Sequence, residues 1–98
     1  FAFQGHTHMP GVLTENYTFF SPEELGNEYR LGQEKAMINV GSVGQPRDND
    51  ARACYVILDT VEKCLRYRRV EYDIAAVQER MREAGLPERH ITRLEVGW

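Results

Sequence analysis

Two strand-like runs that lie close together in the sequence constrain the fold of this chain most strongly. Residues 53–58 (ACYVIL) form a continuous apolar run, and residues 65–72 alternate large and charged side chains. A short polar segment separates the runs, which is typical of two antiparallel strands joined by a turn. The sequence therefore predicts a β-hairpin in its second half.

The segment after this hairpin changes to a helical period. Apolar residues recur at helical spacing from Asp73, and Gly85 stands where a C-terminal glycine cap is expected. Pro87 then predicts the start of a second short helix, which we expect to end at about Glu95. The chain should thus end in two helices.

The first half of the chain predicts shorter elements with strand character. Apolar runs at 36–40 and 53–58 are typical of strands buried on both faces. The expected elements before the hairpin are the end of a buried strand at 1–4, a strand at 12–20 with a polar interruption, a short helix starting at Ser21-Pro22-Glu23-Glu24, and strands at 29–31 and 35–40. This order predicts a mixed α/β fold.

Length and composition exclude several classes of protein. A chain of 98 residues forms one domain at most, and its net charge of -3 disfavours non-specific binding of nucleic acid. We find no apolar run of about 18 residues, so no membrane span is expected. Cys54 and Cys64 should be too far apart in the hairpin to bridge, which favours free thiols and a cytoplasmic location.

The expected elements look like part of a domain. A sheet buried on both faces needs more covering layers than these elements provide, and Phe1 and Phe3 begin the chain within a core-like strand. We therefore expect residues 1–98 to be a portion of a larger domain, with sheet partners elsewhere.

The segment Gly5-His6-Thr7-His8-Met9-Pro10 carries the clearest chemical signal. In an extended segment His6 and His8 would point the same way, about 7 Å apart. Such a pair suits two metal ions about 3.5–4 Å apart, with one histidine on each. A structural or surface role is the alternative, but α/β proteins commonly place their chemistry at strand ends, and the pair follows a strand.

A second loop, GSVGQPRD at residues 41–48, also follows a strand. Its glycines expose backbone N–H groups, and Arg47 could bind a phosphate through its planar guanidinium. Alternatively, Arg47 pairs with Asp48 or Asp50 and the glycines only shape a turn. Asn39, just before the loop, either fixes the loop backbone or is an ordinary strand residue.

Three arginines in the second strand of the hairpin have a simpler interpretation. Arg66, Arg68 and Arg69 are expected to form one solvated strand face, with charges matched by Glu62 and Glu71. We do not expect this cluster to bind nucleic acid specifically.

Taken together, these motifs resemble one protein family. The segments GHTHMP, INVGSVGQPRDNDARACYVILD and RRVEYDIAAVQERMREAGLP are similar to the C-terminal part of bacterial and archaeal calcineurin-like metallophosphoesterases. The resemblance covers nearly the whole chain and is weakest at residues 12–35. One departure is Val40, where the family loop usually has a proline.

The resemblance implies a fold and a metal site. The fold would be a four-layer α/β/β/α sandwich, of which residues 1–98 form the C-terminal portion of a single domain whose N-terminal part is absent. His6 and His8 would each ligate one of two divalent transition-metal ions (Mn, Fe, Zn or Ni). The family's other ligand motifs precede Gly-His-x-His and do not occur here.

The resemblance also implies an activity. The parent protein would be a phosphoesterase in which the two metals activate a hydroxide that hydrolyses phosphomonoesters or phosphodiesters. Gln45 and Arg47 would contact the substrate, a small phosphoester, a nucleotide or a phosphoprotein. The chain alone should be inactive. The alternative is a non-catalytic interaction module derived from the same fold.

Overall fold

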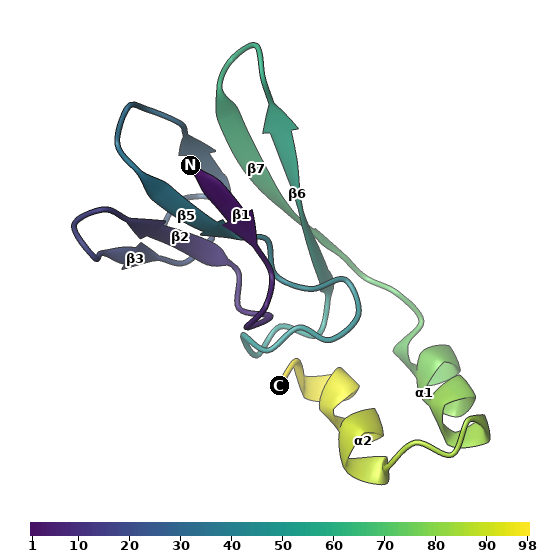
Figure 1. Ribbon diagram of the computed structural model, residues 1–98. Coiled ribbons are helices and arrows are strands. Elements are labelled where there is room, and N and C mark those ends of the chain that lie inside the picture. The colour runs from purple at the N-terminus through teal and green to yellow at the C-terminus, as the bar shows by residue number, and fades with distance from the viewer.

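The computed structural model describes residues 1–98 as seven strands followed by two helices (Figure 1). This order confirms a mixed α/β chain with C-terminal helices. The elements are β1 Ala2–Gln4, β2 Gly11–Thr14, β3 Phe19–Phe20, β4 Glu28–Arg30, β5 Ala36–Asn39, β6 Ala53–Asp59, β7 Cys64–Val70, α1 Ile74–Glu83 and α2 Glu88–Val96.

The strands form two sheets that pack against each other. The first has the order β1-β5-β2-β3 and is mixed, because β1 runs parallel to β5 while the other pairs are antiparallel. The second has the order β4-β7-β6 and is antiparallel. Buried side chains from both sheets meet in one core, made of Val12, Ala36, Ile38, Cys54, Leu65 and Tyr67.

Tyr67 ties the two sheets together through its hydroxyl group. The ring is 2% exposed, and the hydroxyl oxygen lies 2.8 Å from the carbonyl oxygens of both Gly11 and Asn39 in the first sheet. The single phenolic proton can be donated to one carbonyl at a time. This burial raises the pKa of Tyr67, so the group remains a neutral donor.

The hairpin expected at 53–72 is confirmed, but the expected burial of its first strand on both faces is wrong. β6 and β7 pair in register from Ala53 opposite Val70 to Asp59 opposite Cys64, and Cys54 and Cys64 are free. Tyr55 and Ile57 are 39% and 42% exposed. Because no helix packs on its sheet, the face of β6 that points away from the core meets solvent.

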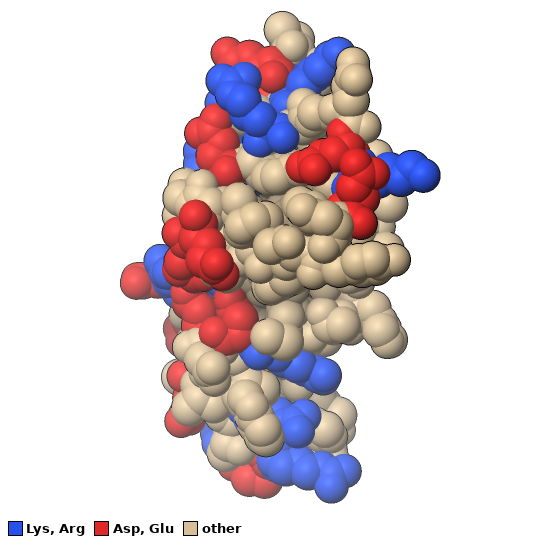
Figure 2. Space-filling view, turned by 90° about the vertical axis from the view of Figure 1, so that its left-hand side faces the viewer, with Lys and Arg blue, Asp and Glu red and all other residues tan.

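The first sheet likewise has one open face. A row of cross-strand neighbours, Ala2, Met37, Leu13 and Phe19, alternates with the row that contains the core residues Ile38 and Val12. Phe1, Phe3 and Met37 are 42–63% exposed, so the expected burial of residues 1–4, and of 36–40 on both faces, is wrong. Figure 2 shows a side of the molecule on which an uncharged surface lies between charged side chains above and below it.

Residues 12–20 form a hairpin instead of one strand. β2 and β3 pair across a turn in which Tyr17 has a φ of 62° and its N–H donates to the Thr14 carbonyl at 3.0 Å. The polar residues that we expected to interrupt a strand thus reverse the chain direction.

The helix expected at Ser21 does not form, although its capping contacts do. The Ser21 and Glu24 side chains each accept a hydrogen bond from the other residue's backbone N–H, at 3.3 and 3.2 Å. Gly26 and Asn27 then adopt φ values of 65° and 64°, which ends the segment after a single turn.

Both terminal helices are confirmed. Asp73 caps α1 by accepting a hydrogen bond from the Ala76 N–H at 3.0 Å, and Gly85 follows the helix with a φ of 77°. The helices pack on each other and on no strand, and they lie at one end of the molecule (Figure 1). No helix is sufficiently long and apolar to cross a membrane.

Candidate functional site

The histidine segment is a turn, so the expected extended geometry is wrong. It follows β1, the His8 N–H donates to the Gly5 carbonyl at 3.2 Å, and His8 has a φ of 61°. The alternation of side chains that would place His6 and His8 on one side of a strand does not apply to such a turn. Their proximity in sequence nevertheless keeps both residues in the turn at the end of β1.

His8 has a defined orientation because its ring contacts the neighbouring loop. Nδ1 lies 2.8 Å from the Gln45 carbonyl oxygen, and the Arg47 N–H donates to the His8 carbonyl at 3.1 Å. A carbonyl can only accept, so Nδ1 carries the proton in the neutral ring and Nε2 keeps its lone pair. Histidines that bind metals are commonly held in this way by their second nitrogen.

His6 is less constrained than His8. Its backbone N–H donates to the Gln4 side chain at 2.9 Å, while its exposed ring has no hydrogen-bond partner. Neither ring nitrogen is held by a hydrogen bond, so either one can supply the lone pair that binds a metal.

Asn39 joins the two loops, and the alternative in which its side chain fixes the loop backbone is confirmed. It is 4% exposed, donates from Nδ2 to the Thr7 hydroxyl at 2.7 Å, and accepts from the Gly41 N–H at 2.9 Å. Gly41 has a φ of 80°, and a Cβ there would lie 2.9 Å from Cys54. The geometry at Gly41 thus requires glycine.

The Ser42 side chain shapes the loop that carries Gln45 and Arg47. Its hydroxyl accepts hydrogen bonds from the N–H groups of Gly44 and Gln45 at 3.1 and 2.8 Å. Its carbonyl accepts from the Cys54 N–H at 2.8 Å, which fastens the loop to β6. These contacts give Ser42 a structural role.

Arg47 pairs with neither neighbouring aspartate, so that alternative is wrong. Its guanidinium is exposed and donates to the Gln45 side chain at 3.2 Å. Asp48 instead binds Arg69, and Asp50 binds Arg52 at 2.8 Å. The Arg47 guanidinium therefore keeps most of its donors available for an anion.

The three arginines of β7 do not share one solvated face. Arg66 pairs with Glu62 at 3.4 Å as expected, but the Arg69 side chain is only 8% exposed. Arg69 contacts Asp48, and its Nε lies 3.6 Å from the Asp50 carboxylate. It lies on the other face of β7 from Arg66 and Arg68, because successive side chains of a strand point to opposite faces. Arg69 thereby joins β7 to the loop.

Asp50 is the most strongly perturbed acid near the loop. The hydrogen bond from the Arg52 side chain is the main cause that lowers the pKa of Asp50 to about 2, and the charge of Arg69 contributes further. Asp50 is therefore ionised at neutral pH and holds both arginines in place.

His6 and His8 fit a divalent transition metal by their donor chemistry, since a neutral imidazole suits Mn, Fe, Zn and Ni. Residues 1–98 contain no group of three or more histidine, cysteine or acidic side chains that could hold a metal ion. The two histidines are thus an incomplete ligand set.

The sequence analysis missed two residues beside this turn. Arg93 and Trp98 border the same hollow of about 320 Å³ as Thr7, Met9 and Arg47. Neither residue belongs to a motif, and only the packing of the C-terminal segment brings them near the histidines. The single tryptophan was the one compositional signal that could have drawn attention to them.

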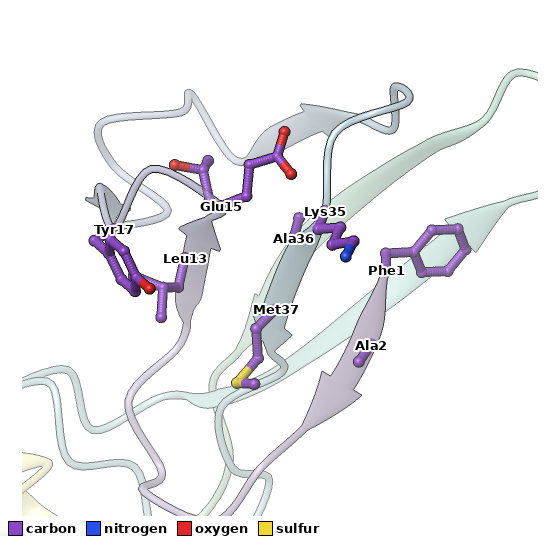
Figure 3. A pocket seen from close by; sticks show the side chains of 9 residues that line it. Phe1, Ala2, Leu13, Glu15, Tyr17, Lys35, Ala36 and Met37 are labelled. Carbon is purple, nitrogen blue, oxygen red and sulfur yellow. The ribbon is translucent and has the colours of Figure 1, made fainter.

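A larger hollow lies elsewhere in the structure. It has about 550 Å³ and opens on the outer face of the first sheet, between apolar side chains such as Phe1, Leu13 and Met37, with Lys35 and Glu15 at its border (Figure 3). Neither histidine lines it. Its lining contains one acidic residue, Glu15, and no histidine or cysteine, so it offers no metal-ligand cluster. We therefore place the candidate site at the histidine turn.

Comparison with known proteins finds similar proteins, among them one of known sequence and one of known structure. An uncharacterized protein of Methanocaldococcus jannaschii is 40% identical over 95 residues, which cover 97% of this chain and 38% of that protein. The crystal structure of a metallophosphoesterase from Sphaerobacter thermophilus superposes with a TM-score of 0.83 and 40% identity, over 98% of this chain and 41% of that one. No protein family model matches the sequence.

These comparisons define the fold. The chain has two sheets and two helices that are similar to part of a metallophosphoesterase of known structure. It spans about two-fifths of the length of each relative.

Proposed function

We propose that this chain belongs to the calcineurin-like metallophosphoesterases and forms the C-terminal portion of a single four-layer α/β/β/α domain. Its 40% identity to a metallophosphoesterase across 98% of its length supports this assignment. In this proposal the remainder of that domain covers the outer faces of the two sheets, which are open within residues 1–98.

The proposed activity is hydrolysis of a phosphomonoester or phosphodiester in the intact protein. The hydrogen bond from His8 Nδ1 to the Gln45 carbonyl is the observation that carries this proposal, because it leaves Nε2 free at the end of a strand. His6 and His8 would each hold one of two divalent transition-metal ions. When bound, such ions supply Lewis-acid charge stabilisation and an activated water.

The side chains around the turn have roles of their own in this proposal. The Gln45 carbonyl holds the His8 ring in the required tautomer, and Asn39 keeps the histidine turn against the loop. Arg47 would bind the phosphate oxygens of the substrate through its guanidinium, and the Gln45 side chain, which accepts from Arg47, would orient it. The substrate class is a small phosphoester or nucleotide, or a phosphoprotein, in the cytoplasm.

Metal content and turnover of the intact protein test the proposal together. With Mn²⁺ and bis(p-nitrophenyl) phosphate, we expect hydrolysis that falls at least about 100-fold in His6→Ala and His8→Ala, together with loss of bound metal. His90→Ala, on α2, is the matched control and should keep both properties.

The alternative is a non-catalytic interaction module of the same fold. It is favoured if the intact protein binds no metal and hydrolyses no phosphoester. The observation behind it is that residues 1–98 contain no complete metal-ligand set.

A further inference from the structure

A hollow beside the histidine turn brings Arg93 and Trp98, which the proposed function has not used, next to Arg47. It has a volume of about 320 Å³ and is lined by Thr7, Met9, Arg47, Arg93 and Trp98. These residues come from three separate segments: the histidine turn, the loop after β5, and the C-terminal segment formed by α2 and the two residues after it. Thr7 lies between His6 and His8, so the hollow borders the candidate metal site.

Backbone contacts hold these three segments together. The Arg47 N–H donates to the His8 carbonyl at 3.1 Å, and the Asn49 N–H donates to the Gly97 carbonyl at 2.8 Å. Gly97 has a φ of 69°, and a Cβ there would lie 2.5 Å from backbone atoms of Asp50. These contacts fix the position of the C-terminal segment against the loop and the histidine turn.

The hollow has a positive lining. Arg47 and Arg93 both border it, and no acidic residue does. Neither arginine takes part in an ion pair, whereas Arg52, Arg66, Arg69 and Arg82 all do. Two guanidiniums without an acidic partner at one hollow suit the several oxygens of a phosphate group.

The hollow also has an aromatic wall. Trp98 is 61% exposed, and the Arg93 guanidinium carbon lies 5.2 Å from the centre of its ring. This cation–π contact orients the indole and leaves much of its surface open. An exposed indole next to a cation is a suitable stacking surface for a planar aromatic ring.

We propose that Arg47, Arg93 and Trp98 form a subsite for a phosphate ester that carries a planar aromatic ring, such as a nucleoside monophosphate. The arginines bind the phosphate, and the indole stacks on the base. This inference rests on the proposed function and narrows its substrate class. It also gives Arg93 and Trp98 a role in substrate selection.

Equilibrium binding to the intact protein tests this subsite without turnover. AMP and ribose 5-phosphate are titrated in the presence of EDTA, with calorimetry and tryptophan fluorescence as readouts. AMP should bind at least about fivefold more tightly than ribose 5-phosphate, since stacking of a base on an aromatic side chain raises the affinity by at least that factor. It should also quench the fluorescence of Trp98.

Variants separate the two parts of the subsite. Trp98→Leu should remove the preference for AMP, and Trp98→Phe should retain most of it. Arg93→Ala should weaken the binding of both ligands, while Arg89→Ala, an exposed arginine of the same helix, should bind like the unmodified protein. Circular dichroism verifies that each variant is folded.

The results distinguish this subsite from the proposed activity. Equal affinity for the two ligands, no binding of AMP, or an unchanged preference in Trp98→Leu would overturn the subsite, even if bis(p-nitrophenyl) phosphate is hydrolysed. A preference for AMP that depends on Trp98, in a protein that hydrolyses no phosphoester with Mn²⁺, would support the subsite and overturn the proposed activity.

Discussion

Arg69 should be the most important charged residue for the stability of the loop that carries Arg47. Its side chain is only 8% exposed and is paired with Asp48, while its Nε lies 3.6 Å from Asp50. These contacts connect the middle of the second sheet to residues 41–50. Arg69→Met keeps an extended side chain in place but removes the charge and its hydrogen bonds.

The cost of this substitution follows from burial. Removing one partner of a buried ion pair costs about 3–5 kcal/mol, because the remaining charge is buried without compensation. The side chains of Asp48 and Asp50 are 15% and 22% exposed, so water can partly solvate the carboxylates that lose their arginine partner. We therefore expect Arg69→Met to lower the free energy of unfolding by about 2–4 kcal/mol.

Urea unfolding of the intact protein, followed by circular dichroism, measures this difference. Arg68→Met is the matched control, because Arg68 lies next to Arg69 on β7, is exposed and forms no ion pair, so it should change stability by less than about 0.5 kcal/mol. If Arg69→Met is as stable as Arg68→Met, the ion pair does not hold the loop. Asp48→Asn combined with Arg69→Met should cost less than the two single changes added together.

Three further predictions concern acid stability, the C-terminal turn and activity. Because the folded-state pKa of Asp50 is about 2, below its ordinary 3.8, Asp50 stabilises the fold above pH 3.8 and this contribution, at most about 2 kcal/mol, is lost as the pH falls toward 2. Acid unfolding should show this loss, and Arg52→Leu should reduce it. Gly97→Ala should lower the free energy of unfolding, measured with urea, by more than about 2 kcal/mol, because the φ of Gly97 is 69° and a Cβ there would overlap the Asp50 backbone. Gly44→Ala is the control and should be neutral, since the space around Gly44 is open. Residues 1–98 on their own should not hydrolyse bis(p-nitrophenyl) phosphate with Mn²⁺, and robust turnover would show that two histidines suffice.

The elements that sequence analysis predicted correctly are those with strong local signals. The hairpin of β6 and β7 is encoded by two long runs with a turn between them, and α1 by its helical period and Gly85. Strand β5 is likewise a compact apolar run. In each case the residues that decide the structure are close together in the sequence.

The errors occurred where distant or subtle contacts decide the structure. Residues 12–20 reverse direction at Tyr17, which adopts a positive φ that its residue type does not suggest. The capping contacts at Ser21 formed, but Gly26 and Asn27 prevented a helix. Local propensity cannot show which of two such opposing signals will dominate.

In the candidate site, too, the residues with a local sequence signal were predicted and those that depend on distant contacts were not. His6 and His8 were identified because of their spacing and neighbours, but their turn geometry depends on a contact with Gln45, 37 residues further along the chain. Arg93 and Trp98 reach the site only through packing of the C-terminal segment against the loop. Long-range contacts of this kind have no signature in a single sequence.

A crystal structure of the intact protein grown with Mn²⁺, with anomalous data, is the most direct test of the central claim that His6 and His8 are metal ligands. We predict two anomalous peaks beside the turn, one bound by His8 through Nε2 and the other by His6. A structure in which neither imidazole contacts an ion would contradict the claim.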